Sequence, residues 1–110
     1  MEVRITARHC SITESTRALT DARVSRLTRF EPRVAGADVL FSEDGGSRRH
    51  VEMRVTVPGA AVMQAHGEAD SFRAALDRAA DRLERQLRRR HSRRRSHRAV
   101  PTSEALGAQP

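Results

Sequence analysis

The chain has 110 residues and a formal net charge of +7, and its basic residues are all arginine. This length suits one domain with a modest hydrophobic core, and the positive charge favours nucleic acid or an anionic membrane as a partner. No apolar segment approaches the length of a membrane span, and the first residues lack the apolar core of a signal peptide. The single cysteine permits no internal disulfide. We therefore expect a cytoplasmic protein that makes no membrane contact.

Two elements are predicted in the first third of the chain. Residues 2–7 alternate between apolar and polar side chains, which is typical of a half-buried strand. A helix start follows, in which either Thr13 is the N-cap or Ser11 and Glu14 form a capping box. We prefer Thr13, because an isoleucine then precedes the cap as a hydrophobic staple. The helix is expected to extend to about Phe30, since a proline two residues later ends it.

Arg23 falls near the middle of the apolar face of this helix, among Leu19, Val24 and Leu27. A buried guanidinium without a partner would be strongly unfavourable. Arg23 must therefore either extend its aliphatic stem to water or emerge in a groove between packed elements. Both alternatives leave its charged head at the domain surface.

Three further strands are predicted over residues 37–43, 50–57 and 60–69. The turn sequence at residues 44–47 separates the first two, and a Pro-Gly pair separates the last two. The last of these strands is expected to be the weakest, because it is rich in alanine and contains Gly67.

A long helix begins near Asp70 and presents three different faces. Its apolar residues recur with a helical period: Phe72, Leu76, Ala79, Leu83 and Leu87. Arginines occupy one flank and acids the other: Arg78, Arg82, Arg85 and Arg89 against Asp77, Asp81 and Glu84. We interpret the acids as partners of arginines one turn later, Asp81 with Arg85 and Glu84 with Arg88. The segregated charges and the arginine run that follows Leu87 predict binding of a polyanion.

The element order predicts an α+β fold of two layers with the pattern β-α-β-β-β-α. The first two strands should be parallel through a right-handed crossover, and the others should form an antiparallel meander. Because each strand has one apolar face, both helices should cover the same face of a four-stranded mixed sheet. They would lie side by side with a basic groove or ridge between them. We expect residues 1–95 to form this domain and residues 96–110 to be a disordered tail.

The chain contains no convincing catalytic or metal-binding constellation. Its histidines are scattered, and Cys10 has no second thiol and no metal-ligand spacing. The three phenylalanines are assigned to the core, so platforms for stacking bases are missing. We therefore expect a protein that is no enzyme, with no metal, cofactor or small-molecule substrate, and whose binding rests on backbone and shape rather than on base identity.

Two motifs resemble the family of ribosome hibernation-promoting factors, which includes the ribosome-associated inhibitor called protein Y. The first comprises residues 5–9, 12–17 and 26–30, and the second is residues 74–87 in the last helix. The resemblance covers roughly residues 1–95 and implies the same strand order. It also implies binding to the small ribosomal subunit and its ribosomal RNA at the decoding centre, where messenger and transfer RNA would lie. Matching basic positions are Arg17, Arg23, Arg26 and Arg29 on the first helix, and Arg78, Arg82, Arg85, Arg88 and Arg89 on the last.

The sequence departs from the family pattern at two points. Family members usually carry an aromatic residue at the position of Arg73, whereas here Phe72 stands one residue earlier. Long members carry a second domain that pairs ribosomes, and this chain resembles the short form. The main alternatives are a generic RNA-binding module, since the helix–sheet arrangement is similar to double-stranded-RNA-binding domains, and a protein-binding modulator of a sigma factor.

Overall fold

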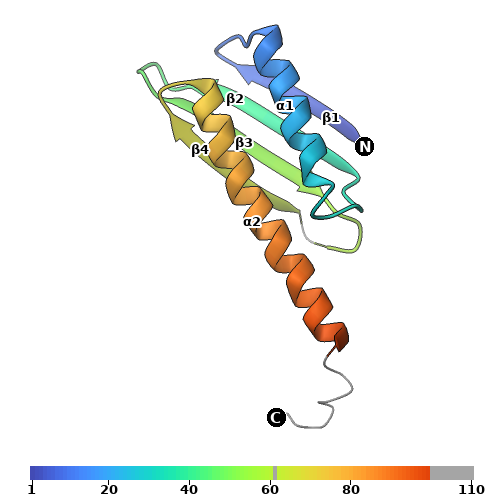
Figure 1. Cartoon of the computed structure of the whole chain (residues 1–110). Coiled ribbons are helices and arrows are strands. Elements are labelled where there is room, and N and C mark those ends of the chain that lie inside the picture. The colour runs from blue at the N-terminus through green and yellow to red at the C-terminus, as the bar shows by residue number, and fades with distance from the viewer. Residues whose placement is uncertain (61, 100–110) are drawn as a thin grey trace.

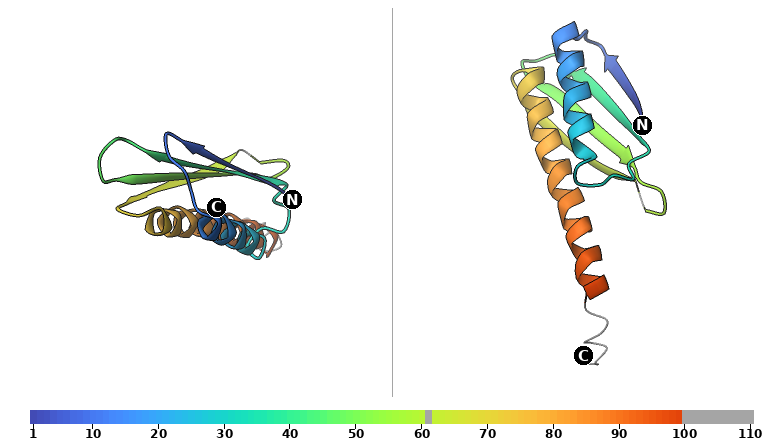
Figure 2. Two further views of the ribbon diagram at one scale, coloured as in Figure 1. Left: turned by 90° about the horizontal axis from the view of Figure 1, so that it is seen from above. Right: turned by 45° about the vertical axis from the view of Figure 1, so that its right-hand side comes forward.

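The protein is a four-stranded sheet covered on one face by two helices (Figures 1 and 2). The computed structural model describes residues 1–60 and 62–99, with side chains as far as residue 90. In chain order the elements are β1 (Glu2–Arg8), α1 (Glu14–Leu27), β2 (Gly36–Glu43), β3 (Arg49–Thr56), β4 (Met63–Ala69) and α2 (Phe72–Ala99). The sheet order is β1-β2-β3-β4, with β1 parallel to β2 and the other pairs antiparallel. The predicted two-layer α+β fold is confirmed.

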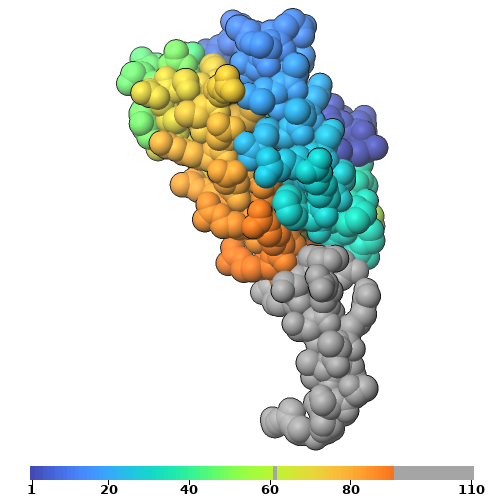
Figure 3. Space-filling model, viewed as in Figure 1, coloured from blue at the N-terminus to red at the C-terminus, as the bar shows by residue number. Residues whose placement is uncertain are grey.

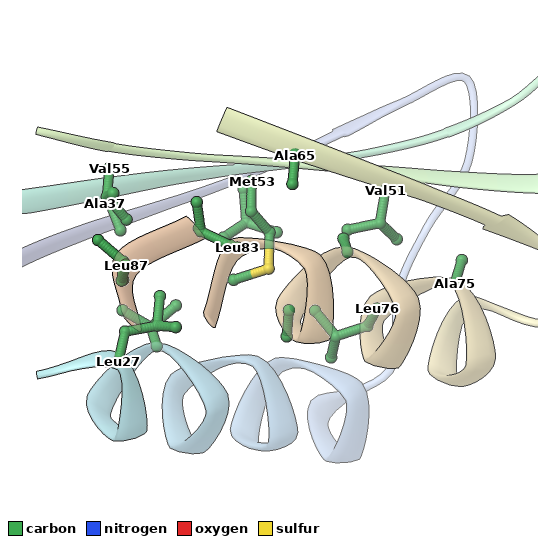
Figure 4. Packing of buried hydrophobic residues seen from close by; sticks show 14 of the residues in the cluster. Leu27, Ala37, Val51, Met53, Val55, Ala65, Ala75, Leu76, Leu83 and Leu87 are labelled. Atoms are coloured by element: carbon green, nitrogen blue, oxygen red, sulfur yellow. The ribbon is translucent and has the colours of Figure 1, made fainter. Parts of the chain in front are cut away.

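The sheet buries alternate residues because successive side chains of a strand point to opposite faces. Val39 lies opposite Met53, and Phe41 lies opposite Val51, and all four are fully or almost fully buried. Figure 4 shows the apolar side chains of the sheet meeting those of α2, with α1 closing the other side of the same core. The opposite face of the sheet carries mostly polar side chains and is uncovered by any described element.

At Gly67 the backbone of α2 approaches the sheet closely. A Cβ at this position would lie 2.3 Å from the carbonyl oxygen of Ala75 and 2.7 Å from the amide nitrogen of Ala79. Both alanines are fully buried. The small residues of β4, expected to weaken the strand, therefore let the helix backbone pack directly against it.

The boundaries of α1 agree with the preferred N-cap and differ at the C-terminal end. Thr13 Oγ1 accepts a hydrogen bond from the backbone N–H of Thr16 at 3.1 Å, which confirms Thr13 as the cap. The helix ends at Leu27, although the sequence predicted an end near Phe30. Residues 28–30 donate to carbonyls three residues earlier, so the last turn tightens before the proline.

The last two elements begin slightly later than predicted. β4 starts at Met63, after a turn in which Gly59 has a φ of 78°. α2 starts at Phe72, where Ser71 Oγ accepts from the backbone N–H of Ala74 at 3.1 Å. α2 continues past the end of the sheet (Figure 1) and includes residues 96–99 of the predicted tail. Residues 100–110, the rest of that tail, lie outside the described residues.

The family pattern has its aromatic residue at the position of Arg73, whereas this chain has Phe72 one residue earlier. Its ring packs edge-to-face on Phe41, with centroids 5.4 Å apart. Arg49 lies over the same ring at 5.5 Å, while Arg73 is exposed. The shifted aromatic residue therefore still anchors the first turn of α2 to the core.

Candidate RNA-binding surface

The two helices run side by side and are joined by a network of charges centred on Arg23. Arg23 Nη1 lies 2.7 Å from Asp77 Oδ1, and its Nη2 lies 2.8 Å from Asp81 Oδ1. Only 14% of the Arg23 side chain is exposed. Of the two outcomes expected for Arg23, the structure has the second, a place in the groove between packed elements. The head is held by carboxylates of α2 rather than presented freely at the surface.

Glu84 extends this network by one helical turn. Its side chain is only 4% exposed, and its Oε2 lies 3.5 Å from Arg23 Nη2 and 3.4 Å from Arg26 Nε. The predicted pairs of Asp81 with Arg85 and Glu84 with Arg88 are therefore wrong. Because the acids of α2 face α1, their closest cations are more than fifty residues away in the sequence. The first half of the seam between the helices is charge-compensated, which corrects the expected basic groove.

The second half of the seam is dominated by arginine. Arg88 of α2 places its guanidinium 4.8 Å from the ring centre of Phe30, which follows α1. This cation–π contact holds a planar cation at the surface of the helical layer. Arg26 is half exposed, and Arg29 is exposed without an ionic partner among the described residues. Positive charge therefore accumulates where the end of α1 lies beside residues 84–88 of α2.

A buried carboxylate below this region was not anticipated from the sequence. Glu31 is 2% exposed, and its Oε2 lies 3.3 Å from Arg33 Nε while its Oε1 lies 3.7 Å from Arg90 Nε. The sequence placed Arg90 in the arginine run that follows Leu87 and predicted no partner for it. The contact ties α2 to the loop after α1 at the level where the helix leaves the sheet. The sequence around Glu31, which is followed by a proline, did not predict this contact.

The arginine stripe on the other flank of α2 lies along β4. Arg82 Nη1 donates to the carbonyl of His66 at 2.6 Å, and Arg78 donates to the carbonyl of Glu68. Arg85 and Arg89 have no ion pair or hydrogen bond from their side chains within the described part of the chain. The predicted stripe is thus divided into two cations that contact the sheet edge and two that are available.

A shallow groove lies between β4 and this stripe. Its volume is about 380 Å³, and its basic lining comes from Arg82, Arg85 and Arg89, with His66 from the strand. The remaining predicted residue, Arg17, is exposed, and its side chain makes no ion pair or hydrogen bond with residues 1–60 and 62–90. It lies six residues before Arg23, so a turn of about 100° per residue places it on another face of α1. The space-filling view shows α1 and α2 forming one continuous surface (Figure 3).

The described residues offer little for catalysis or metal binding. No three histidine, cysteine, aspartate or glutamate side chains within them group closely enough to hold a metal ion. Burial raises the pKa of the Cys10 thiol, and the Glu43 carboxylate raises it further. The thiol also donates weakly to the Phe41 carbonyl at 3.6 Å, so it is not an activated nucleophile. None of the helices in the described ranges has both the length and the apolar character needed to span a bilayer.

The family follows from comparison with known proteins. Residues 3–95 match the family described as "Sigma 54 modulation protein / S30EA ribosomal protein". The chain belongs to this family. This confirms the resemblance seen in the two sequence motifs.

Curated proteins with similar sequences include two named as hibernation factors. A ribosome hibernation promotion factor of Deinococcus radiodurans is 31% identical over 86 residues, covering 74% of this chain and 44% of that protein. A ribosome hibernation promoting factor of Azotobacter vinelandii is 29% identical over 85 residues, covering 77% of this chain and 78% of that protein. The chain therefore spans less than half the length of the first relative and most of the second.

Solved structures of S30EA-like proteins share the fold. The N-terminal domain of Thermus thermophilus protein Y is 31% identical, with a TM-score of 0.72, covering 81% of this chain and 98% of that one. A ribosomal subunit interface protein from Coxiella burnetii has a TM-score of 0.76, covering 84% of this chain and 99% of that one. The latter is 22% identical, so its likeness concerns the fold alone.

Proposed function

We propose that this protein is a ribosome-associated translation inhibitor that acts in the cytoplasm during hibernation or stress. The observation that carries this proposal is the family match over residues 3–95, together with relatives named as hibernation factors. The positive surface of the helical layer supports it independently, because arginine suits bidentate contact with phosphate.

The target in this proposal is ribosomal RNA of the small subunit, near the decoding centre. The available cations are Arg85, Arg88 and Arg89 on α2 and Arg29 in the turn after α1, together with Arg26 of α1, which is half exposed although its Nε contacts Glu84. Phosphates spaced along an RNA backbone would contact this surface, and Arg17 would contact RNA from the other side of α1. Arg23, Arg78 and Arg82 would act chiefly by holding the surface in shape, because carboxylates or carbonyls already occupy part of each guanidinium.

Inhibition in this proposal requires occupancy alone. A protein bound at the decoding centre excludes messenger RNA and the A- and P-site transfer RNAs by volume. No bond is formed or broken, which agrees with the thiol chemistry described for Cys10. Affinity should therefore depend strongly on salt, since each neutralised phosphate releases counterions.

The test is sedimentation of purified ribosomes with the protein through a sucrose gradient. The wild-type protein should migrate with small subunits or whole ribosomes. Arg85→Ala/Arg89→Ala should bind more weakly and show a salt slope flatter by roughly 0.7–0.9 log units per lost phosphate contact. Arg73→Ala is the control for each of the single changes Arg85→Ala and Arg89→Ala, because Arg73 is exposed on α2 and lies outside the proposed surface.

Two results would contradict the proposal. Wild-type protein that stays at the top of the gradient at every salt concentration would favour the alternative named in the family description, a modulator of sigma 54. Equal affinity for ribosomes and for an arbitrary RNA duplex would favour a generic RNA-binding module instead.

A further inference from the structure

The two edge strands of the sheet, β4 and β1, differ in whether side chains of the same protein occupy their outward backbone groups. Along β4, side chains of α2 donate to three successive outward carbonyls: Arg78 to Glu68, Arg82 to His66 at 2.6 Å and Gln86 to Gln64 at 3.0 Å. These bonds occupy the acceptors that another strand would need. The edge at β4 is therefore closed to pairing by residues of its own chain.

The edge at β1 has no such cover. The backbone N–H of Glu2 donates toward the β2 side, to the carbonyl of Ala35 at 3.3 Å. In a parallel pair alternate residues face the partner strand, so Val3, Ile5 and Ala7 direct their N–H and C=O groups to the free edge. Within the described part of the chain, no side chain forms a hydrogen bond with the backbone of these three residues. β1 thus presents a regular row of donors and acceptors.

The sequence of β1 is complementary to itself when reversed. Glu2 and Arg8 stand at opposite ends of the strand, both exposed, and neither has an ionic partner among the described residues. Six residues at about 3.3 Å each hold them roughly 20 Å apart, so they cannot pair within one chain. In an antiparallel pair of β1 strands centred on Ile5, Glu2 would lie opposite Arg8 of the partner subunit. Val3 would lie opposite Ala7 of the partner subunit.

We propose that the β1 edge is a homodimer interface, in which a second copy of this chain adds its β1 antiparallel and makes a continuous eight-stranded sheet. Ile5, as the central residue, would exchange both backbone hydrogen bonds with its own copy, and Val3 and Ala7 would exchange theirs. The Glu2–Arg8 pairs fall at non-hydrogen-bonded positions, where opposing side chains are closest. The contact is isologous and closes after two copies, because each chain has its other edge blocked.

The dimer would be weak and reversible. One pair of strands buries less area than stable interfaces do, and two chains of formal charge +7 repel each other. Its geometry nevertheless has a functional consequence. The two-fold axis is perpendicular to the sheet, so the helices of both copies lie on the same face. The arginine surfaces would then form one surface of twice the extent, suited to a longer polyanion than one copy can cover.

The test is a charge exchange across the proposed pair, followed by sedimentation equilibrium over a range of protein concentrations. Arg8→Glu places Glu2 opposite a glutamate, and Glu2→Arg places Arg8 opposite an arginine. Each single change should weaken the dimer about tenfold, and the double variant should restore it. Arg73→Glu, which alters the net charge as much as Arg8→Glu, should leave dimerisation unweakened.

The direction of the Arg8→Glu effect is decisive because this change lowers the overall positive charge and so reduces repulsion between copies. If the dimer is nevertheless weakened, the loss comes from the local pair.

A second measurement, by cross-linking, tests the register of the two β1 strands. Ile5→Cys in a Cys10→Ser background should cross-link under mild oxidation, because directly opposed residues have Cα atoms about 5.5 Å apart. Ala22→Cys, exposed on α1, should not. A protein that is monomeric at all concentrations, a double variant that fails to recover, or equal cross-linking at both positions would overturn the proposal.

Discussion

Single residues fix the distance between the sheet and the helical layer, and Gly67 is a clear example. Gly67→Ala would place a methyl group against backbone atoms of Ala75 and Ala79, at 2.3 and 2.7 Å. We expect destabilisation of about 1–3 kcal/mol from overpacking, measured by urea unfolding. Gly46→Ala is the control, because its Cβ would meet only Asp44 Oδ1 at 3.6 Å. Equal stability of the two variants would show that α2 can move away from β4 without penalty.

Arg23 is the residue whose role changes most between sequence and structure. Arg23→Ala would leave Glu84, which is 4% exposed, with Arg26 as its remaining neighbour. We expect a loss of about 2 kcal/mol in the free energy of unfolding, because a buried charge loses a partner. Arg29→Ala should change stability by no more than about 0.5 kcal/mol. Thermal or chemical denaturation of both variants tests the difference, and similar losses would contradict the network.

At the scale of elements, the apolar stripe of α2 carries the packing of the helical layer. Leu83 is fully buried, and it lies on the side of α2 that faces the sheet (Figure 4). Leu83→Ala should destabilise the domain by about 2–5 kcal/mol, a large share of the stability of a small protein. A loss below about 0.5 kcal/mol in an unfolding experiment would mean that the stripe does not face the core.

Element types could be predicted because they depend on local periodicity, and the strand pairing followed from the order of the elements and the handedness of the crossover. The alternation of β1, the N-cap at Thr13 and the stripe of α2 are all visible within a few residues. The end of α1 was missed because residues 28–30 have helical character and differ only in their tighter hydrogen bonds. A glycine in a strand is compatible both with a weak strand and with a close approach of another element, so the role of Gly67 could not be predicted from the sequence.

The partners of the charged side chains could not be predicted for a different reason. An arginine on one helix and an aspartate on another meet only after both helices have docked, as Arg23 and Asp77 do across 54 positions. Local rules for helices consider neighbours one turn away and therefore assigned the acids to arginines of their own helix. The same limit hid the contact between Glu31 and Arg90.

For the whole molecule, the positive charge lies partly on the surface of the packed helices and partly on the arginines that follow Arg90. Truncation after Arg90 removes four arginines while keeping the contact with Glu31. Association with ribosomes should become slower at low salt and approach the wild-type rate at high salt, because long-range attraction is screened. Stopped-flow binding at several salt concentrations measures this. Block of translation at saturating protein should survive, and its complete loss would assign the inhibitory contact to residues 91–110.

The close contact at Gly67 also limits which genetic changes can rescue the protein. The atoms that a new methyl group would meet at Ala75 and Ala79 belong to the main chain, and every amino acid has them. A selection for suppressors of Gly67→Ala should therefore never recover a replacement at residue 75 or 79. Suppressors should instead map to side chains that set the height of the whole helix above the sheet, such as Leu76 or Met53. Rescue of this variant should therefore come from residues other than the two alanines that the new methyl group meets.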